Sequence, residues 1–209
     1  VTLADKVYCW GYNQYYQFGN GTTRTSEAPV RAASDSTLAA VAMGSDSGCG
    51  LDRRGAAFCW GSNGSGEDGG GQRPSNGNTY TKVPTPVVGG LTFRSLSLSD
   101  GYSCGVDVND RGYCWGVSRF VGSRVTNNVS TPTPIALDQK VRAISAGKDH
   151  ACAITTTDEI WCWGGNRNGQ LGAGASNGSA VPVRSAGELK AAEISAANVS
   201  FGFAAFTCA

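Results

Sequence analysis

Residues 152–164, with the sequence CAITTTDEIWCWG, place two cysteines ten positions apart and follow the second one with Trp-Gly. The same arrangement recurs at residues 49–61 and 104–116. Nine intervening residues suit two antiparallel strands joined by a tight turn, in which facing cysteines lie close enough for a disulfide. Asp or Asn followed by Gly, as in residues 52–55 and 109–112, is typical of such turns. Each of the three segments is therefore predicted to be a disulfide-bonded hairpin.

The two remaining cysteines, Cys9 and Cys208, have this spacing only across the chain ends, as if Ala209 ran into Val1. Cys9 also begins a fourth Cys-Trp-Gly, so the strands that end at Cys208 and at Cys9 are expected to form one more hairpin. The predicted disulfides are Cys49 with Cys59, Cys104 with Cys114, Cys152 with Cys162, and Cys9 with Cys208. The spacing leaves open whether Cys9 and Cys208 pair within one chain or between two chains.

Cys-Trp-Gly starts at positions 9, 59, 114 and 162, which divides the chain into four repeats of about 50 residues. Each repeat combines strand-like segments with a Gly- and Asn-rich loop and a proline-marked segment, such as residues 28–30 or 84–87. A unit of this size cannot bury its own apolar face, and radial stacking of such units gives a propeller. We therefore predict an all-β fold, a single four-bladed β-propeller domain over residues 1–209. One disulfide stabilises each blade, and residues 1–11 complete the last blade by pairing the N- and C-terminal strands.

The fourth Cys-Trp-Gly continues as Gly165-Asn166-Arg167-Asn168-Gly169-Gln170-Leu171-Gly172, and residues 12–19 are a looser version of this segment. These residues resemble the regulator of chromosome condensation repeat, which typically contains Trp-Gly-x-Asn followed by Gly-Gln-Leu-Gly. Residues 147–153 resemble the preceding strand of that family, whereas the second and third copies are degenerate beyond Trp-Gly. The resemblance extends over essentially the whole chain and implies a β-propeller. The familiar ring of that family has more units than the four found in this sequence.

Composition and charge narrow the class of protein. The 17 basic and 16 acidic residues are scattered and give a net charge of +1, so no surface for nucleic acid or for an anionic membrane is expected. The longest apolar stretches, residues 38–43 and 200–208, are shorter than the roughly 20 residues of a membrane-spanning helix. Eight cysteines in matched pairs favour an oxidising compartment, so secretion is predicted, with any secretory signal already removed ahead of Val1.

No catalytic, metal or cofactor site is predicted. His150 is the only imidazole and is interpreted as structural, and the cysteine pairs lack the close spacing of zinc ligands. Glu67 and Asp68 lie in a Gly-rich loop and are interpreted as solvated rather than as cation ligands. The Trp of each Cys-Trp-Gly is expected to pack between blades, with an aromatic sugar-binding ring as the alternative. Exposed binding contacts are predicted instead at Tyr15, Tyr16, Tyr80 and Trp161.

Glycosylation of the loops is predicted from five N-x-[ST] sequons. The sequons are Asn20, Asn63, Asn128, Asn177 and Asn198. The first four follow Cys-Trp-Gly in successive repeats, so propeller symmetry would place them on one side of the disc. The alternative is chance, because Asn, Ser and Thr are common in loops.

The leading functional hypothesis is a secreted, non-catalytic structural or binding module that contacts other proteins, glycans or copies of itself. A homopolymer formed by exchange of terminal strands, as in an extracellular fibre or coat, belongs to this class. The alternatives are a lectin or an inhibitor of an extracellular enzyme, and a hydrolase that depends on His150. The family resemblance implies another, an intracellular guanine-nucleotide exchange factor for a small GTPase at chromatin. That role predicts a reducing compartment and a basic surface, and the sequence indicates neither.

Overall fold

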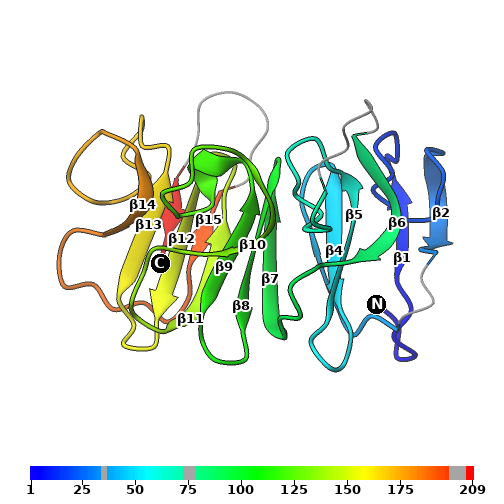
Figure 1. Ribbon diagram of the computed structural model, residues 1–209, viewed down its shortest axis with the longest axis horizontal. Coiled ribbons are helices and arrows are strands. Elements are labelled where there is room, and N and C mark those ends of the chain that lie inside the picture. The colour runs from blue at the N-terminus through cyan, green and yellow to red at the C-terminus, as the bar shows by residue number, and fades with distance from the viewer. Residues whose placement is uncertain (34–36, 73–78, 198–205) are drawn as a thin grey trace.

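The computed structural model describes residues 1–33, 37–72, 79–197 and 206–209. Within these ranges the chain forms sixteen β-strands and one short 3-10 helix, η1 (Ser118–Phe120). The strands make three four-stranded and two two-stranded antiparallel sheets (Figure 1). No helix in the described part of the chain is long and apolar enough to cross a membrane. The all-β class predicted from the sequence is confirmed.

Each four-stranded sheet is one blade, built from strands that are consecutive in the sequence. The first blade consists of β3 (Ala40–Met43), β4 (Ser47–Leu51), β5 (Ala57–Ser62) and β6 (Tyr80–Pro86). The second consists of β7 (Phe93–Ser99), β8 (Tyr102–Asp107), β9 (Gly112–Gly116) and β10 (Val129–Pro134). The third consists of β11 (Val141–Ala146), β12 (His150–Thr155), β13 (Ile160–Gly164) and β14 (Ser179–Arg184).

The two middle strands of each blade carry a disulfide. In all three blades the two cysteines are directly opposite each other in the antiparallel register, with Cα atoms 4.0 Å apart. The pairs are Cys49–Cys59, Cys104–Cys114 and Cys152–Cys162. These are three of the four pairings that the spacing predicts, and all six cysteines are buried in the blade cores.

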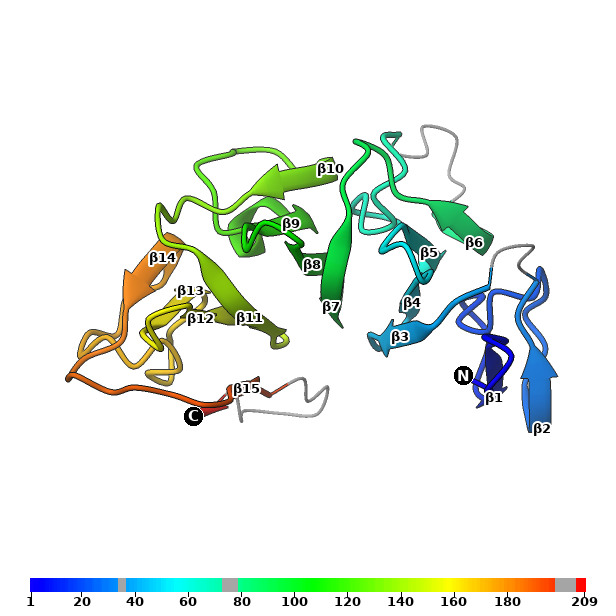
Figure 2. The ribbon, with the colours of Figure 1, turned by 90° about the horizontal axis from the view of Figure 1, so that it is seen from below.

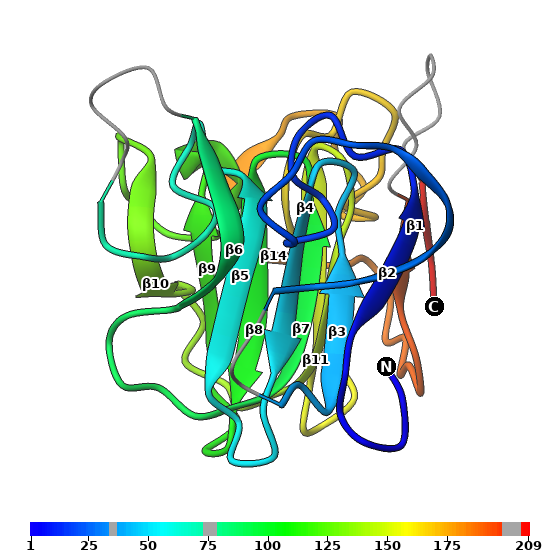
Figure 3. The ribbon, with the colours of Figure 1, turned by 90° about the vertical axis from the view of Figure 1, so that its right-hand side faces the viewer.

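The blades are arranged in an open arc (Figure 2). The first strand of each blade lies on the concave side of this arc, and the last strand lies on the outer side. Because the strands of successive blades run in the same general direction, their connections gather at two ends of the assembly (Figure 3). The loops that follow Cys-Trp-Gly lie at one end, and the hairpin turns between paired cysteines lie at the other.

The two-stranded sheets lie at the opposite ends of the arc. β1 (Tyr8–Gly11) pairs with β2 (Ser26–Arg31) at one end, and β15 (Ser195–Ala196) pairs with β16 (Thr207–Cys208) at the other. Cys9 and Cys208 are therefore free thiols. The predicted closure within one chain, with residues 1–11 completing the last blade, is not formed. The physical reason is that the three complete blades lie between the two chain ends and separate them (Figure 2).

Neighbouring blades pack through a buried Trp from three of the four Cys-Trp-Gly segments. Trp60, Trp115 and Trp163 are all 0 % exposed. Each indole Nε1 donates a hydrogen bond to a backbone carbonyl in the loop of the preceding repeat, which satisfies the polar end of a buried aromatic ring. The acceptors are Gln17 (2.7 Å), Glu67 (2.9 Å) and Phe120 (2.7 Å). The predicted packing role is confirmed for these three Trp residues and is wrong for Trp10, which is 63 % exposed because the described chain places no further blade against it.

Candidate binding surface

The loop after Cys-Trp-Gly is shaped by an Asn and a Gln that bond to its backbone. In the first repeat, the side-chain oxygen of Asn13 accepts a hydrogen bond from the Phe18 amide, and that of Gln17 accepts one from the Tyr15 amide, both at 2.9 Å. The equivalent pair in the third blade is Asn166 and Gln170. These internal bonds fix the loop conformation, so its other side chains are presented outward from a rigid base.

Four tyrosines gather where the loop of the first repeat meets the start of β6, and we call Tyr12, Tyr15, Tyr16 and Tyr80 the tyrosine cluster. The Tyr15 and Tyr80 rings stack with centroids 6.0 Å apart, and the Tyr16 and Tyr80 centroids are 5.7 Å apart. Tyr12 packs edge-on against Tyr15. The Lys82 ammonium lies 5.6 Å from the Tyr16 ring centroid, within the range of a cation–π interaction.

The tyrosine cluster combines exposed aromatic faces with hydroxyl groups. Tyr12 is 57 % exposed and Tyr15 is 36 % exposed. Desolvation, reinforced by the neighbouring Tyr15 phenol, raises the pKa of Tyr12 above its usual value. A tyrosine hydroxyl is protonated at neutral pH in any case and can donate a hydrogen bond. Rigid aromatic groups with a polar end are the side chains that protein and sugar binding sites use most. The cluster is therefore the best candidate for an exposed contact.

The structure brings together three of the four binding residues predicted from the sequence. Tyr15, Tyr16 and Tyr80 belong to the cluster, whereas Trp161 lies on β13 of the third blade and is half-buried. Tyr12 was not predicted. The signal that would have identified it is the Tyr-x-x-Tyr-Tyr pattern of residues 12–16, which the Asn13 turn folds into one surface.

The sequons differ in accessibility. Asn177 is exposed, and Asn20 and Asn128 are half-buried. Asn63 is 2 % exposed and its side-chain oxygen accepts a loop amide, so the folded loop has no room for a glycan there. Asn198 lies outside the described residues. Glycosylation thus stays a prediction for the accessible sites.

Glu67 and Asp68 are buried, which corrects their interpretation as solvated loop residues. Glu67 accepts a hydrogen bond from the Ser62 hydroxyl (2.9 Å), and Asp68 accepts one from the Thr81 hydroxyl (2.6 Å). Glu67 stands eight residues after its cysteine, as Gln17 does in the first repeat, and both shape the loop from inside. Among the residues that the structure describes, no group of three or more His, Cys, Asp or Glu side chains could hold a metal ion.

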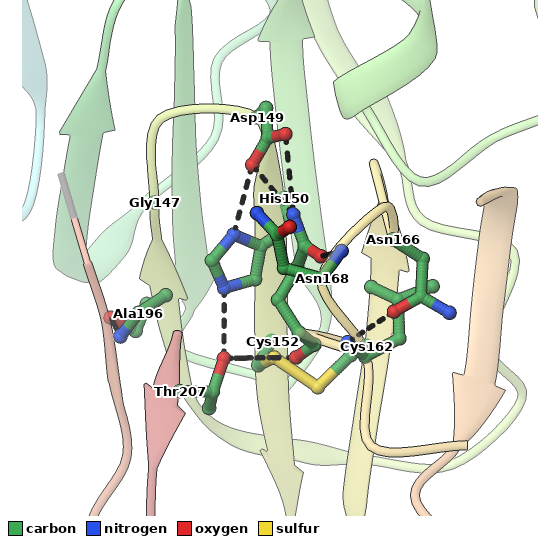
Figure 4. A network of polar contacts seen from close by, with 12 residues as sticks. Gly147, Asp149, His150, Cys152, Cys162, Asn166, Asn168, Ala196 and Thr207 are labelled. Carbon is green, nitrogen blue, oxygen red and sulfur yellow. Dashed lines mark hydrogen bonds and ion pairs between the residues drawn. A yellow bond between two sulfur atoms is a disulfide. The ribbon is translucent and has the colours of Figure 1, made fainter. Parts of the chain in front are cut away.

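His150 joins the third blade to β16 (Figure 4). Its Nε2 lies 2.8 Å from the Thr207 hydroxyl, and its Nδ1 lies 3.4 Å from the Asp149 carboxylate. The ring is completely buried. Burial lowers the pKa of His150 from its usual value, and the nearby Asp149 carboxylate offsets only part of this effect. The imidazole is therefore neutral at neutral pH and acts as a structural link.

We expect the attachment of β15 and β16 to weaken as the pH falls from 7 to 5. Because the pKa of His150 is lowered by folding, the folded state binds fewer protons than the unfolded state below about pH 6.5. The stability of the folded state that depends on neutral His150 is present above this pH, and it is lost as the pH falls toward and through the lowered pKa of His150. Amide hydrogen exchange at Ala196 and Thr207, corrected for intrinsic rates, should report faster opening at pH 5.

His150→Gln is the matched control, because Gln can still donate a hydrogen bond to Thr207 but does not titrate. The pH dependence of exchange in β15 and β16 should disappear in this variant. An unchanged pH dependence would assign the effect to other groups.

The disulfide-bonded blades, the Trp interface and the loops on one end define a β-propeller type of scaffold. Two sequence profiles of the regulator of chromosome condensation (RCC1) repeat match the chain, one at residues 4–51 and 157–200 and the other at residues 39–67 and 141–170. Together they span residues 4–67 and 141–200, more than half of the sequence. The chain belongs to the RCC1 repeat family.

Solved structures have the same fold. Human WBSCR16 is 20 % identical, with a TM-score of 0.81 over 93 % of this chain and 52 % of its own. Prp20p from Saccharomyces cerevisiae is 18 % identical, with a TM-score of 0.76 over 88 % of this chain and 47 % of its own. The ectodomain of the Arabidopsis thaliana receptor kinase ACR4 is 18 % identical, with a TM-score of 0.53 over 94 % of this chain and 51 % of its own. This chain spans about half the length of each.

Proposed function

We propose that this protein is a secreted, non-catalytic binding module that contacts another protein through its tyrosine cluster. The observation that carries the proposal is the cluster itself, in which Tyr12 and Tyr15 are exposed on a loop held rigid by Asn13 and Gln17. Such preorganised aromatic groups bind with little loss of side-chain entropy. A glycan partner, as in a lectin, would use the same surface.

The disulfides support an extracellular location. One disulfide lies in the core of each complete blade, and disulfides of this structural kind form and persist in oxidising compartments. The same fold occurs in the ectodomain of the receptor kinase ACR4, which is an extracellular setting. Exposed Asn177 and half-buried Asn20 and Asn128 offer glycan sites that would suit a secreted protein.

A protein partner is favoured over nucleic acid. Prp20p binds Gsp1p and histones, so this fold is used elsewhere to bind proteins. In this chain the basic and acidic residues nearly cancel, which gives no charge bias toward DNA. The alternative function, an intracellular guanine-nucleotide exchange factor, would place the protein in a reducing compartment. Its disulfides would not persist there.

The non-catalytic assignment is supported by the surroundings of His150. The imidazole is completely buried and its Nε2 is engaged by Thr207, so it is not accessible to a substrate. A hydrolase that used this residue as a general base would need it at the surface of a cleft.

Replacing two cluster residues, Tyr15→Ala with Tyr80→Ala, is expected to weaken peptide binding by roughly 30-fold or more, because aromatic anchors carry most of the affinity in such contacts. The probe is a phage-displayed library of random peptides, selected on the wild-type protein. Affinities of the enriched peptides for both proteins are then measured by surface plasmon resonance.

Val108→Ala is the control, because Val108 is exposed in a hairpin turn at the opposite end of the strands. Equal peptide affinity in the tyrosine variant and the control would overturn the proposed site. A glycan array run in parallel tests the lectin alternative, which requires sugar binding that the tyrosine variant loses.

A further inference from the structure

We propose that the two ends of the arc are two halves of one blade, and that two copies of this chain complete each other's split blade to close a ring. In each composite blade, β15 and β16 come from one copy, and β1 and β2 come from the other. This goes beyond the proposed binding function, because it assigns a partner to a surface that the tyrosine cluster does not use.

The strand register identifies β15 and β16 as the first half of a blade. In the second and third blades, a Ser of the first strand lies opposite the first cysteine, as Ser97 does with Cys104 and Ser145 with Cys152. The same relation holds between Ser195 and Cys208. The C-terminal pair of strands therefore has the register of the first two strands of a complete blade.

The strands β1 and β2 have the register of the second half. In complete blades the second cysteine lies opposite a residue of the last strand, as Cys59 does with Thr85 and Cys162 with Val183. Cys9 lies opposite Val30 in the same way. What each two-stranded sheet lacks, among the described residues, is the central pairing that joins cysteine to cysteine. Its edge thus presents backbone groups that a complementary strand can satisfy.

Gly11 has the same backbone conformation, at the same β-bulge, as the glycine of Cys-Trp-Gly in the complete blades. Gly164, at the same repeat position, has φ of 103°, and a Cβ there would lie 2.6 Å from the carbonyl oxygen of Asp149, the residue immediately before the middle strand β12. Gly11 has φ of 99°, yet no atom of the described chain lies within 4 Å of its Cβ position. Among the described residues, the space beside Gly11 that a middle strand fills in a complete blade is therefore open.

Trp10 belongs to the first Cys-Trp-Gly but, unlike its three counterparts, does not pack between two blades of the described chain. It is 63 % exposed, whereas its three counterparts are fully buried. Between the first and second blades, the Glu67 carbonyl accepts hydrogen bonds from both Trp115 Nε1 and the Ser103 hydroxyl, each at 2.9 Å. At the C-terminal end, the Gln170 carbonyl accepts one bond, from the Thr207 hydroxyl at 3.1 Å. Thr207 immediately precedes its cysteine, as Ser103 does, so no Trp of the described residues takes the corresponding place at the C-terminal end.

A cavity of about 320 Å³ lies at this place. Its lining includes Gln170, Leu171, Gly172, Phe206 and Thr207. In the complete interfaces the indole covers the corresponding glycine, and a Cβ at Gly69 would lie 2.9 Å from Trp115 Nε1. At Gly172 the nearest atom belongs to Ser185 instead, at 3.4 Å. The indole of Trp10 from a second copy fits this cavity and would cover exposed Phe206.

Because the arc is open, its two ends do not meet within one chain. The partner of each end is therefore a second copy of the chain. The complete blades hold the two ends apart (Figure 2). Two chains related by a two-fold axis supply six complete and two composite blades, and closed propellers contain about four to eight blades. The contact is head-to-tail, and the two-fold rotation closes it.

In the composite blade, Cys208 of one copy and Cys9 of the other occupy the positions that form a disulfide in complete blades. With glutathione disulfide as oxidant, exposed Cys208 displaces one glutathione thiol and forms a mixed disulfide. Cys9 then attacks the Cys208 sulfur and releases the second glutathione thiol. Each cysteine loses its proton, and the two electrons reduce glutathione disulfide to two thiols.

The directional pairing can be tested with two single variants of different tag length, Cys9→Ser and Cys208→Ser. Each alone is expected to give no covalent dimer in a glutathione redox buffer. A 1:1 mixture should give a covalent heterodimer, with a disulfide between the two remaining terminal cysteines identified by peptide mapping. No enrichment of heterodimer over the separate variants, or a wild-type ladder of longer multimers, would overturn the closed two-chain ring.

The non-covalent contact is tested in the double variant Cys9→Ser with Cys208→Ser by sedimentation velocity. Adding Trp10→Ala should weaken dimerisation by roughly 30-fold or more, because a buried Trp anchor is lost. Trp10 is exposed within the chain, so circular dichroism should stay unchanged. Adding Val108→Ala instead should leave the dimer intact. Equal effects of the two substitutions would contradict the proposal.

Discussion

Replacing Trp115 with Ala is expected to lower the free energy of unfolding by about 3–5 kcal/mol. Trp115 is completely buried between the first and second blades, where its ring packs 5.8 Å from that of Phe93. The substitution also removes the donor to the Glu67 carbonyl. Because domains are typically stable by only about 5–15 kcal/mol, this loss is a large share of the total. Urea denaturation followed by far-UV circular dichroism measures it.

Trp10→Ala is the matched control for Trp115→Ala, since both residues stand in Cys-Trp-Gly. Trp10 is exposed in the single chain, so its replacement should change the stability of the monomer by no more than about 0.5 kcal/mol. Similar losses in the two variants would mean that the repeat position, and not burial between blades, determines the cost.

Removing the central disulfide with Cys104→Ala and Cys114→Ala is expected to cost about 2–4 kcal/mol. The bond closes a hairpin and lies in the core of the second blade, so its loss increases the freedom of the unfolded chain and leaves unfilled volume. For a chain of this size the melting temperature should fall by roughly 10 °C, as measured by calorimetry.

Cys9→Ser provides the comparison, because the Cys9 thiol is free in the structure. The melting temperature of this variant, measured on the monomer, should stay close to that of the wild type. A central-disulfide variant that melts with the wild type would show that the blades do not depend on their covalent link.

The hairpins could be predicted from the sequence because their determinants are local. Cysteine spacing, turn residues and Trp-Gly act within a dozen positions, so Cys152 and Cys162 or Cys104 and Cys114 specify their own pairing. The packing role of Trp163 followed from its repeat position. Its acceptor, the Phe120 carbonyl, could not be predicted, since η1 replaces the loop geometry of the other repeats there.

The closure of the ring depends on an angle that spacing does not encode. The circular C-x9-C pattern relates Cys9 to Cys208, but the structure places the two cysteines in separate two-stranded sheets, opposite Val30 and Ser195 respectively. Whether these strands meet within one chain depends on how sharply each blade turns relative to the next. That turn is set by side-chain packing between blades, which only the three-dimensional structure reveals.

Only part of the tyrosine cluster could be predicted, because one of its members is distant in the sequence. Tyr15 and Tyr16 are neighbours in the sequence, but Tyr80 contacts them from the start of β6 in the first complete blade. Burial of Glu67 was missed because composition alone describes its loop as solvated, whereas the Ser62 hydroxyl at the end of β5 and the Ser65 backbone amide both donate to its carboxylate. Loops of this kind bury polar side chains when the backbone itself supplies the partners.

The proposal that two chains complete one propeller is tested most directly by the mass and thiol count of the oxidised wild-type protein. Native mass spectrometry should find a species of twice the 21.5 kDa chain mass, apart from any glycan, and alkylation under denaturing, non-reducing conditions should find no free thiol. A single-chain species would contradict the proposal, whether Cys9 and Cys208 are alkylated or are joined within that chain.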